Sequence, residues 1–226
     1  MANTVAAVRS DERWKPASEL HLLNQESQFA SLELLTLRGL FPKGLRRGAI
    51  AEIDGYRSSG RTSICLHVLA QATLRGEVCA VIDLYDSFHP ASAAAAGVRL
   101  ERLLWVRCHG DAEHAMRTAD LLLHAGGFGV VLLDLCEASP RILNRIPLSY
   151  WYRFRRAIEQ TPTVLLLCAE SPQAKSCSSN RLQLKHNAFH WSGKLPFLRL
   201  CGLQADALVR KAKVIRPESL FIRTVS

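Results

Sequence analysis

The sequence predicts an α/β fold with a central, mostly parallel sheet and flanking helices. Short apolar runs alternate along the chain with longer segments that have helical periodicity. Strands that are apolar on both faces are typical of a parallel sheet covered by helices on each side. Beyond Ser171 apolar and polar residues alternate, and this pattern favours antiparallel strands at the C-terminal end of the sheet.

The individual elements follow in chain order from the same patterns. Turn residues bracket the apolar run at 49–53, which predicts the first strand of the sheet. Later apolar runs predict further strands at 78–84, 103–108, 130–135 and 163–169. Helices are expected at 62–75, 91–96, 113–125 and 150–160. The tail at 207–226 is expected to form one more hairpin.

The length and charge of the chain limit its class and its partners. Its 226 residues suit one α/β core. The formal net charge of +9 favours a negatively charged partner such as nucleic acid, although solubility alone also explains a modest excess. The apolar runs are too short to span a bilayer, and no charged-then-apolar leader opens the chain. We therefore expect a cytoplasmic protein without membrane contact.

The cysteines and histidines show no spacing typical of a metal site. The seven cysteines are an odd number, contain no CxxC pair and lie mostly in apolar runs. A thiol in such a run packs as a small apolar group, so we expect these cysteines to be reduced and structural. The eight histidines lack ligand spacing as well.

The segment GYRSSGRTS lies between a predicted strand and a predicted helix. Gly55 and Gly60 are five residues apart and Thr62 opens the helix, which is the spacing of a loop whose backbone N–H groups bind phosphate. Arg61 stands where such a loop normally has lysine, and its planar guanidinium is bulkier than an ammonium group. We expect weak or unproductive binding of ATP and magnesium. The simpler alternative is a serine-rich turn that caps a helix.

A second acid supports the phosphate loop. Asp134 lies near the end of the apolar run VVLLDL, at the carboxyl end of a predicted strand, where a carboxylate reaches magnesium in nucleotide-binding proteins. Thr62 and Asp134 would hold metal only if a magnesium-nucleotide binds, and an ordinary strand-end acid is the alternative. The degenerate nucleotide site is expected to comprise Gly55, Ser58, Ser59, Gly60, Arg61, Thr62, Ser63 and Asp134.

From Gly39 to the C-terminus the chain resembles the RecA family of bacterial recombinases. The similar segments occur in the family's order and include GLFPKGLRRGAIAEIDG, SSGRTS, EVCAVIDLYDSFHP, AEHAMRTADLLLHAGGFGVVLLDL, NRLQLK and LVRKAKV. The resemblance implies a RecA-like P-loop NTPase fold. It divides the chain into an N-terminal docking arm at 1–38 and a core domain at 39–226, without the C-terminal domain of active recombinases. In the arm, Trp14 and residues 20–23 are candidate docking elements.

The sequence departs from the family at the positions that the resemblance assigns to catalysis. Tyr85 stands at the position of the catalytic glutamate, and a phenol does not act as a base toward water at neutral pH. His89 and Ser92 replace the family's adenine clamp, and Glu170 aligns with its nucleotide-sensing glutamine. We therefore expect no catalytic residue and at most a weak ATPase, in which Asp86 would substitute as the base.

Basic and aromatic residues provide candidate contacts to DNA or to a protein partner. The run YWYRFRR at 150–156 combines both kinds, and on a helix about half of its side chains should face the core, leaving Arg153 and Arg156 exposed. The resemblance implies DNA-binding loops after Asp134 and after Glu170. The candidate contact residues are Arg153, Arg155, Arg156, Lys175, Arg181, Arg210, Lys211 and Lys213.

A small RecA-like chain with a degenerate phosphate loop is also similar to the ImuA family of accessory factors in DNA-damage-induced mutagenesis. This likeness implies a non-catalytic factor that supports translesion synthesis within the SOS response. The implied partners are RecA and a polymerase-like protein of the ImuB kind, and single-stranded DNA is a further candidate. Two alternatives stay open: a weak DNA-stimulated ATPase of the RecA family, and a cell-division inhibitor like those of the SulA group.

Overall fold

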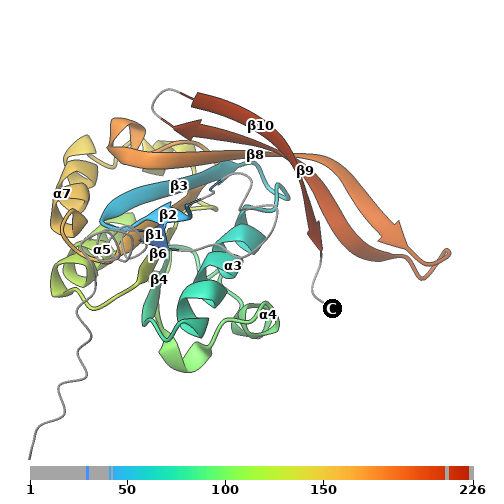
Figure 1. The fold of residues 1–226 in the computed structure, drawn as a ribbon, viewed down its shortest axis with the longest axis horizontal. Helices are drawn as coiled ribbons and strands as arrows, with labels where there is room; N and C mark the ends of the chain where they lie inside the picture. Colours follow the sequence, from blue (N-terminus) through green and yellow to red (C-terminus); the bar gives the residue numbers. More distant parts are fainter. Residues whose placement is uncertain (1–28, 31–40, 42, 212–213, 224–226) are drawn as a thin grey trace, which may run out of the picture.

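The computed structural model describes residues 29–30, 41, 43–211 and 214–223, and its centre is one large sheet with helices on both faces (Figure 1). The strands of this sheet are β3 (Ala49–Gly55), β4 (Cys79–Asp83), β5 (Leu103–Arg107), β6 (Val130–Asp134), β7 (Val164–Ala169), β8 (Ser178–Ser192), β9 (Arg199–Lys211) and β10 (Val214–Arg223). They lie side by side in the order β10-β9-β8-β3-β7-β6-β4-β5.

The pairing confirms a mostly parallel sheet with antiparallel strands at its C-terminal end. All neighbours from β8 to β5 run parallel. β9 pairs antiparallel with both β8 and β10. β3 lies between β7 and β8, and every one of its residues is buried. The loop that follows β3 therefore starts from the middle of the sheet.

Two layers of helices cover the two faces of the sheet. On one face, α3 (Arg61–Leu74) and α4 (Pro90–Ala95) bury their apolar side chains against the strands. On the other face, α5 (Ala112–Ala125), the short α6 (Pro140–Leu143) and α7 (Leu148–Ile158) enclose a second apolar cluster. Figure 1 shows α3 and α4 separated from α5 and α7 by the strands. This arrangement explains why the parallel strands are apolar on both faces.

Local signals in the sequence set several element boundaries. Asp111 precedes α5, and its carboxylate accepts a hydrogen bond from the His114 backbone N–H at 3.0 Å. Gly126 ends the same helix with a φ of 71°. Short 3-10 turns, η1 (Leu100–Arg102) and η2 (Lys175–Cys177), precede β5 and β8. The observed helices and strands begin or end close to the residues expected from the sequence.

The last strands extend beyond the body of the sheet. β8 pairs with β3 only up to Leu184, but it continues to Ser192 in antiparallel register with β9. Figure 1 shows this ribbon projecting on the side opposite α7. The expected tail hairpin is present as β9 and β10, which pair from residue 202 to residue 223.

The predicted docking arm at 1–38 lies largely outside the described residues, and so do Trp14 and residues 20–23. Within the arm, β1 (Phe29–Ala30) pairs antiparallel with β2 (Leu45–Arg46) of the core. The division into an arm and a core stays a prediction. No helix in the described part of the chain is long and apolar enough to cross a membrane.

Candidate functional site

The loop between β3 and α3 has the backbone turn of a phosphate-binding loop. Ser58 and Gly60 have positive φ angles of 59° and 90°, which reverse the chain between strand and helix. No side chain caps the first turn of α3, so its backbone N–H groups keep their binding capacity. Thr62 and Ser63 are exposed on this turn. The buried hydroxyl of Ser59 has no hydrogen-bond partner in the described part of the chain.

Arg61 turns back into the protein. Its side chain is buried, and its Nη1 donates a hydrogen bond to the Gly55 carbonyl oxygen. Its Nη2 donates to the Cys136 carbonyl oxygen at 3.3 Å and lies 3.7 Å from Glu170 Oε1. The guanidinium is thus already bonded to the loop, to the segment after β6 and to the acid after β7. A phosphate at this loop would compete with Glu170 for the cation.

The C-terminal hairpin covers the loop at Gly60. A Cβ atom at this position would lie 2.3 Å from Ile222 Cδ1 and 3.2 Å from Leu203 Cδ2. At Gly55 it would lie 2.5 Å from the Leu184 carbonyl oxygen. Glycine at both positions is therefore required by close approach of β8, β9 and β10, in addition to any role in binding phosphate.

Asp134 ends β6 directly beside Asp83 at the end of β4. Its Oδ1 accepts a hydrogen bond from the Cys136 backbone N–H at 2.9 Å, and its Oδ2 lies 3.5 Å from Ser87 Oγ. Burial raises the pKa of Asp134, although the hydrogen bonds from Cys136 act in the opposite direction. The Asp134 carboxylate thus lies at the expected strand end, and its neighbours are Asp83 and the turn that contains Cys136.

The residues around the catalytic-glutamate position are engaged elsewhere. The Tyr85 ring lies against Gly110 and is partly exposed. Asp86 forms an ion pair with Arg107, with an Nη2–Oδ2 distance of 3.0 Å, and a hydrogen bond with His109 Nδ1 at 2.7 Å. The hydrogen bonds from Arg107 and His109 lower the pKa of Asp86. A more acidic carboxyl group is a weaker base, so Asp86 is poorly suited to activate water.

His89 and Ser92, at the adenine-clamp positions, bond to each other. The His89 ring Nδ1 accepts a hydrogen bond from the Ser92 backbone N–H at 3.2 Å and lies 2.9 Å from Ser92 Oγ. His89 is the N-cap of α4, and Pro90 occupies its first turn. The pair therefore has a structural role at the start of this helix.

A hollow of about 460 Å³ lies beside the phosphate loop. It is lined by the loop residues Tyr56 and Arg57 and by the ends of the segments that follow β6 and β7, including Glu137 and Glu170. An ion pair between Arg57 and Glu137 joins the loop to the segment after β6. Both carboxylates of the hollow already have a basic partner, because Glu137 pairs with Arg57 and Glu170 with Arg61.

Sequence comparison agrees with this fold and loop. The family model described as the RecA N-terminal domain matches residues 26–141, just over half of the chain. The chain belongs to the RecA family. It is also 40% identical over 95 residues to Protein RecA from Laribacter hongkongensis (strain HLHK9). That similarity covers 42% of this chain and 27% of the relative, so the matched segment spans only about a quarter of the relative's length.

The candidate contact residues of this RecA-family chain come from several elements, beginning with α7. Trp151 and Phe154 of α7 are buried, whereas Arg153 and Arg156 are exposed as expected, and Arg155 is exposed as well. Arg153 pairs with Asp120 of α5 at 2.8 Å.

The remaining contact candidates lie on η2 and the C-terminal strands. Lys175 on η2 and Arg210 on β9 are exposed. Arg181 on β8 pairs with the buried Asp54, with its Nη2 2.9 Å from Asp54 Oδ2, so its charge is already compensated. The side chain of Lys211 and the whole of Lys213 lie outside the described residues.

Sequence reasoning did not single out the tip of the β8–β9 ribbon. Here Trp191, Leu195 and Phe197 have exposed fractions of 59%, 83% and 85%. The segment from residue 181 to residue 205 contains no aspartate or glutamate, but it includes Lys185, Lys194 and Arg199. The sequence does contain closely spaced aromatic residues around a Gly-Lys turn. They indicate a binding site only if their side chains are exposed, and the sequence alone does not show exposure.

Proposed function

We propose that this RecA-family chain is a non-catalytic accessory factor in DNA-damage-induced translesion synthesis, as its resemblance to the ImuA family implies. It acts by binding RecA or a polymerase-like partner of the ImuB kind, with single-stranded DNA as a further contact. The observation that carries the proposal is that Arg61 is buried inside the phosphate loop and paired with Glu170.

Phosphoryl transfer needs a free cation at the phosphates, a metal-binding carboxylate and a group that positions the nucleophile. In this chain the cation is paired within the protein, and the glutamate position holds Tyr85. Asp86, the possible substitute base, is held by Arg107 and His109. These features support loss of hydrolysis with retention of the fold.

The tip of the β8–β9 ribbon supports a binding role. Trp191 and Phe197 expose large apolar surfaces, and exposed aromatic groups at the end of a projecting ribbon are typical of protein interaction sites. The surrounding lysine and arginine side chains favour a partner surface with an acidic rim. We therefore expect the ribbon tip to bind an apolar surface with an acidic rim on RecA or on the polymerase-like partner.

Measuring ATP binding and turnover, with and without single-stranded DNA, tests the loss of catalysis. We expect no turnover by the wild-type protein. Glu170→Gln should strengthen ATP binding because it releases Arg61, whereas Glu101→Gln, an exposed position on η1, should not. Turnover that Thr62→Ala abolishes would overturn the proposal in favour of a weak DNA-stimulated ATPase.

Partner binding is tested with purified RecA filaments and the purified polymerase-like protein on a biosensor. We expect wild-type protein to bind at least one of them and the double variant Trp191→Ser/Phe197→Ser to lose that binding. The matched control is Leu121→Ser, which removes an equally exposed apolar side chain from α5. Binding to neither partner, or equal loss in the control, would count against this function.

Identifying the proteins that co-purify with this chain from DNA-damaged cells distinguishes the proposed function from a SulA-like cell-division inhibitor. A cell-division protein recovered in place of RecA and the polymerase-like protein would support a SulA-like inhibitor. For DNA, the salt dependence of binding is informative because each neutralised phosphate releases a counterion. A flat dependence would limit the partners to proteins.

A further inference from the structure

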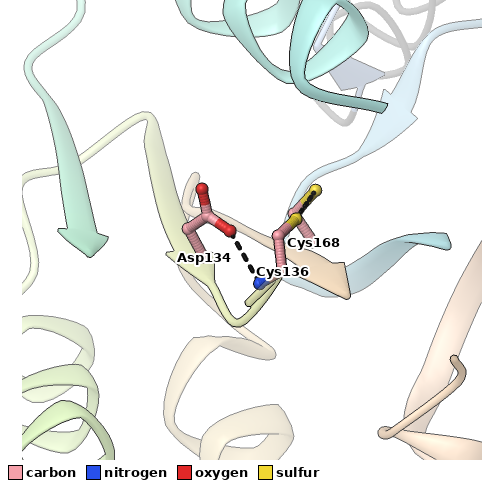
Figure 2. Close-up of side chains that lie close together, drawn as sticks. All are labelled: Asp134, Cys136 and Cys168. Carbon is pink, nitrogen blue, oxygen red and sulfur yellow. Dashed lines mark hydrogen bonds between the residues drawn. The ribbon is translucent and has the colours of Figure 1, made fainter. Parts of the chain in front are cut away.

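Three buried cysteines and one aspartate converge behind the phosphate loop. Cys65 lies on α3, Cys136 follows β6, and Cys168 lies on β7. Asp134, the last residue of β6, adds a carboxylate at the same edge of the sheet. Figure 2 shows Asp134, Cys136 and Cys168 grouped at the strand ends. The topology thus brings Asp134 and Cys136, which are two residues apart, together with Cys168 and Cys65 from distant segments of the sequence.

The donor atoms are within the range that one ion can bridge. The Sγ atoms of Cys136 and Cys168 are 3.1 Å apart. Together with an oxygen of Asp134, they lie within 4.8 Å of one another. Cys65 on α3 is buried in the same cluster as Cys136 and Cys168 and is the candidate for a fourth donor.

The spacing of the two thiols is close to that of two sulfur ligands on a tetrahedral ion. With Zn–S bonds of about 2.3 Å, two sulfur ligands of a tetrahedral ion lie roughly 3.8 Å apart. The two thiols must therefore separate by less than about 1 Å from their positions in the structure. Soft sulfur ligands favour zinc-class ions over magnesium, which prefers oxygen ligands in octahedral geometry.

The surroundings favour a bound cation. Asp83, at the end of β4 beside Asp134, places a second carboxylate next to the site. Arg61, which bonds to the Cys136 carbonyl oxygen, offsets part of the negative charge of a thiolate-rich site. Asp134 is less buried than the cysteines and lies beside Ser87, which gives an ion a route from the surface.

We propose that Cys65, Cys136, Cys168 and Asp134 form a binding site for a divalent transition metal of the zinc class. Binding forms three metal–sulfur bonds and one metal–oxygen bond. Each thiol that coordinates loses one proton to solvent, and no electron is transferred. The site is independent of the proposed function, since it needs neither nucleotide nor a protein partner.

Titration of the full chain with Co²⁺ under a phosphine reductant tests the site. Wild-type protein is expected to show thiolate-to-cobalt charge-transfer absorption that saturates at a single ion per chain and disappears on addition of Zn²⁺. Cys136→Ala and Cys168→Ala should each lose most of this absorption. Cys79→Ala should keep it, because Cys79 is equally buried but lies at the opposite end of β4.

A second measurement covers the case in which the ligand variants fail to fold. Zn²⁺, but not Mg²⁺, is expected to raise the unfolding temperature of the wild-type protein and of Cys79→Ala. Absence of the charge-transfer band together with an unchanged unfolding temperature in Zn²⁺ would overturn the proposal. A band that Cys79→Ala removes while Cys136→Ala and Cys168→Ala retain it would also overturn it.

Discussion

At the scale of single residues, the central strand β3 carries two buried acids with different environments. Asp54 is compensated by Arg181 from β8. Glu52 accepts hydrogen bonds from the backbone N–H groups of Gln173 and Ala174 through Oε1, but its Oε2 is buried without a partner in the described part of the chain. A buried carboxylate with one unpaired oxygen is costly to ionise.

Glu52 should make the protein less stable as the pH rises. Desolvation by burial raises its pKa, so the folded state holds this proton more tightly than the unfolded state. Its contribution to the free energy of unfolding therefore falls as the pH rises above about 4.3, the ordinary pKa of glutamate. We expect Glu52→Gln to reduce the loss of stability between about pH 5 and about pH 8.

Urea unfolding at both pH values measures this effect. The comparison with wild type isolates Glu52 from the other titrating groups, and the exposed Glu101→Gln serves as the control. Equal pH dependence in the wild type and in Glu52→Gln would show that Glu52 is not the cause.

At the scale of elements, α7 has a buried aromatic face and an exposed basic face. Its run of aromatic and basic residues divides by helical periodicity: Trp151 and Phe154 point inward and pack edge to face, with ring centroids 5.9 Å apart. Arg155 and Arg156 point outward. The helix is thus held by aromatic packing against α5 and the sheet, while its outer face stays available for an anionic partner.

Truncation of the Phe154 side chain should lower the stability of the folded protein. The side chain is fully buried, so Phe154→Ala is expected to lower the free energy of unfolding by about 3–5 kcal/mol. Tyr152→Ala removes a similar ring from the exposed side of the same helix and should change it by only about 0.5 kcal/mol. Chemical denaturation of both variants measures the difference, and similar losses would argue against the assignment of the two helix faces.

At the scale of the whole molecule, the body and the projecting ribbon have separate physical roles. The sheet and its two helix layers contain both apolar clusters. The ribbon tip adds exposed aromatic groups and positive charge without burying them. Stability therefore resides in the body, and the tip is free to serve binding.

Shortening the ribbon should leave the fold intact. Residues 190 and 202 are paired, so replacing 191–201 with Asn-Gly joins them through a two-residue hairpin turn. We expect an unfolding midpoint close to that of wild type and loss of partner binding. Circular dichroism during urea unfolding and the biosensor assay measure the two effects. A large fall in stability would show that the tip contributes to the fold.

Patterns in the sequence were enough to predict the fold class, the order of strands and helices and the position of the phosphate loop, and the family resemblance pointed to Tyr85. These features are local, because periodicity, turn residues and motif spacing act within a few neighbouring residues. The pairing of Arg61 with Glu170, the thiols that lie near Asp134 and the aromatic residues that stay exposed became apparent only in the folded chain. Such contacts join distant segments, and they form only when the packed sheet brings its strand ends together.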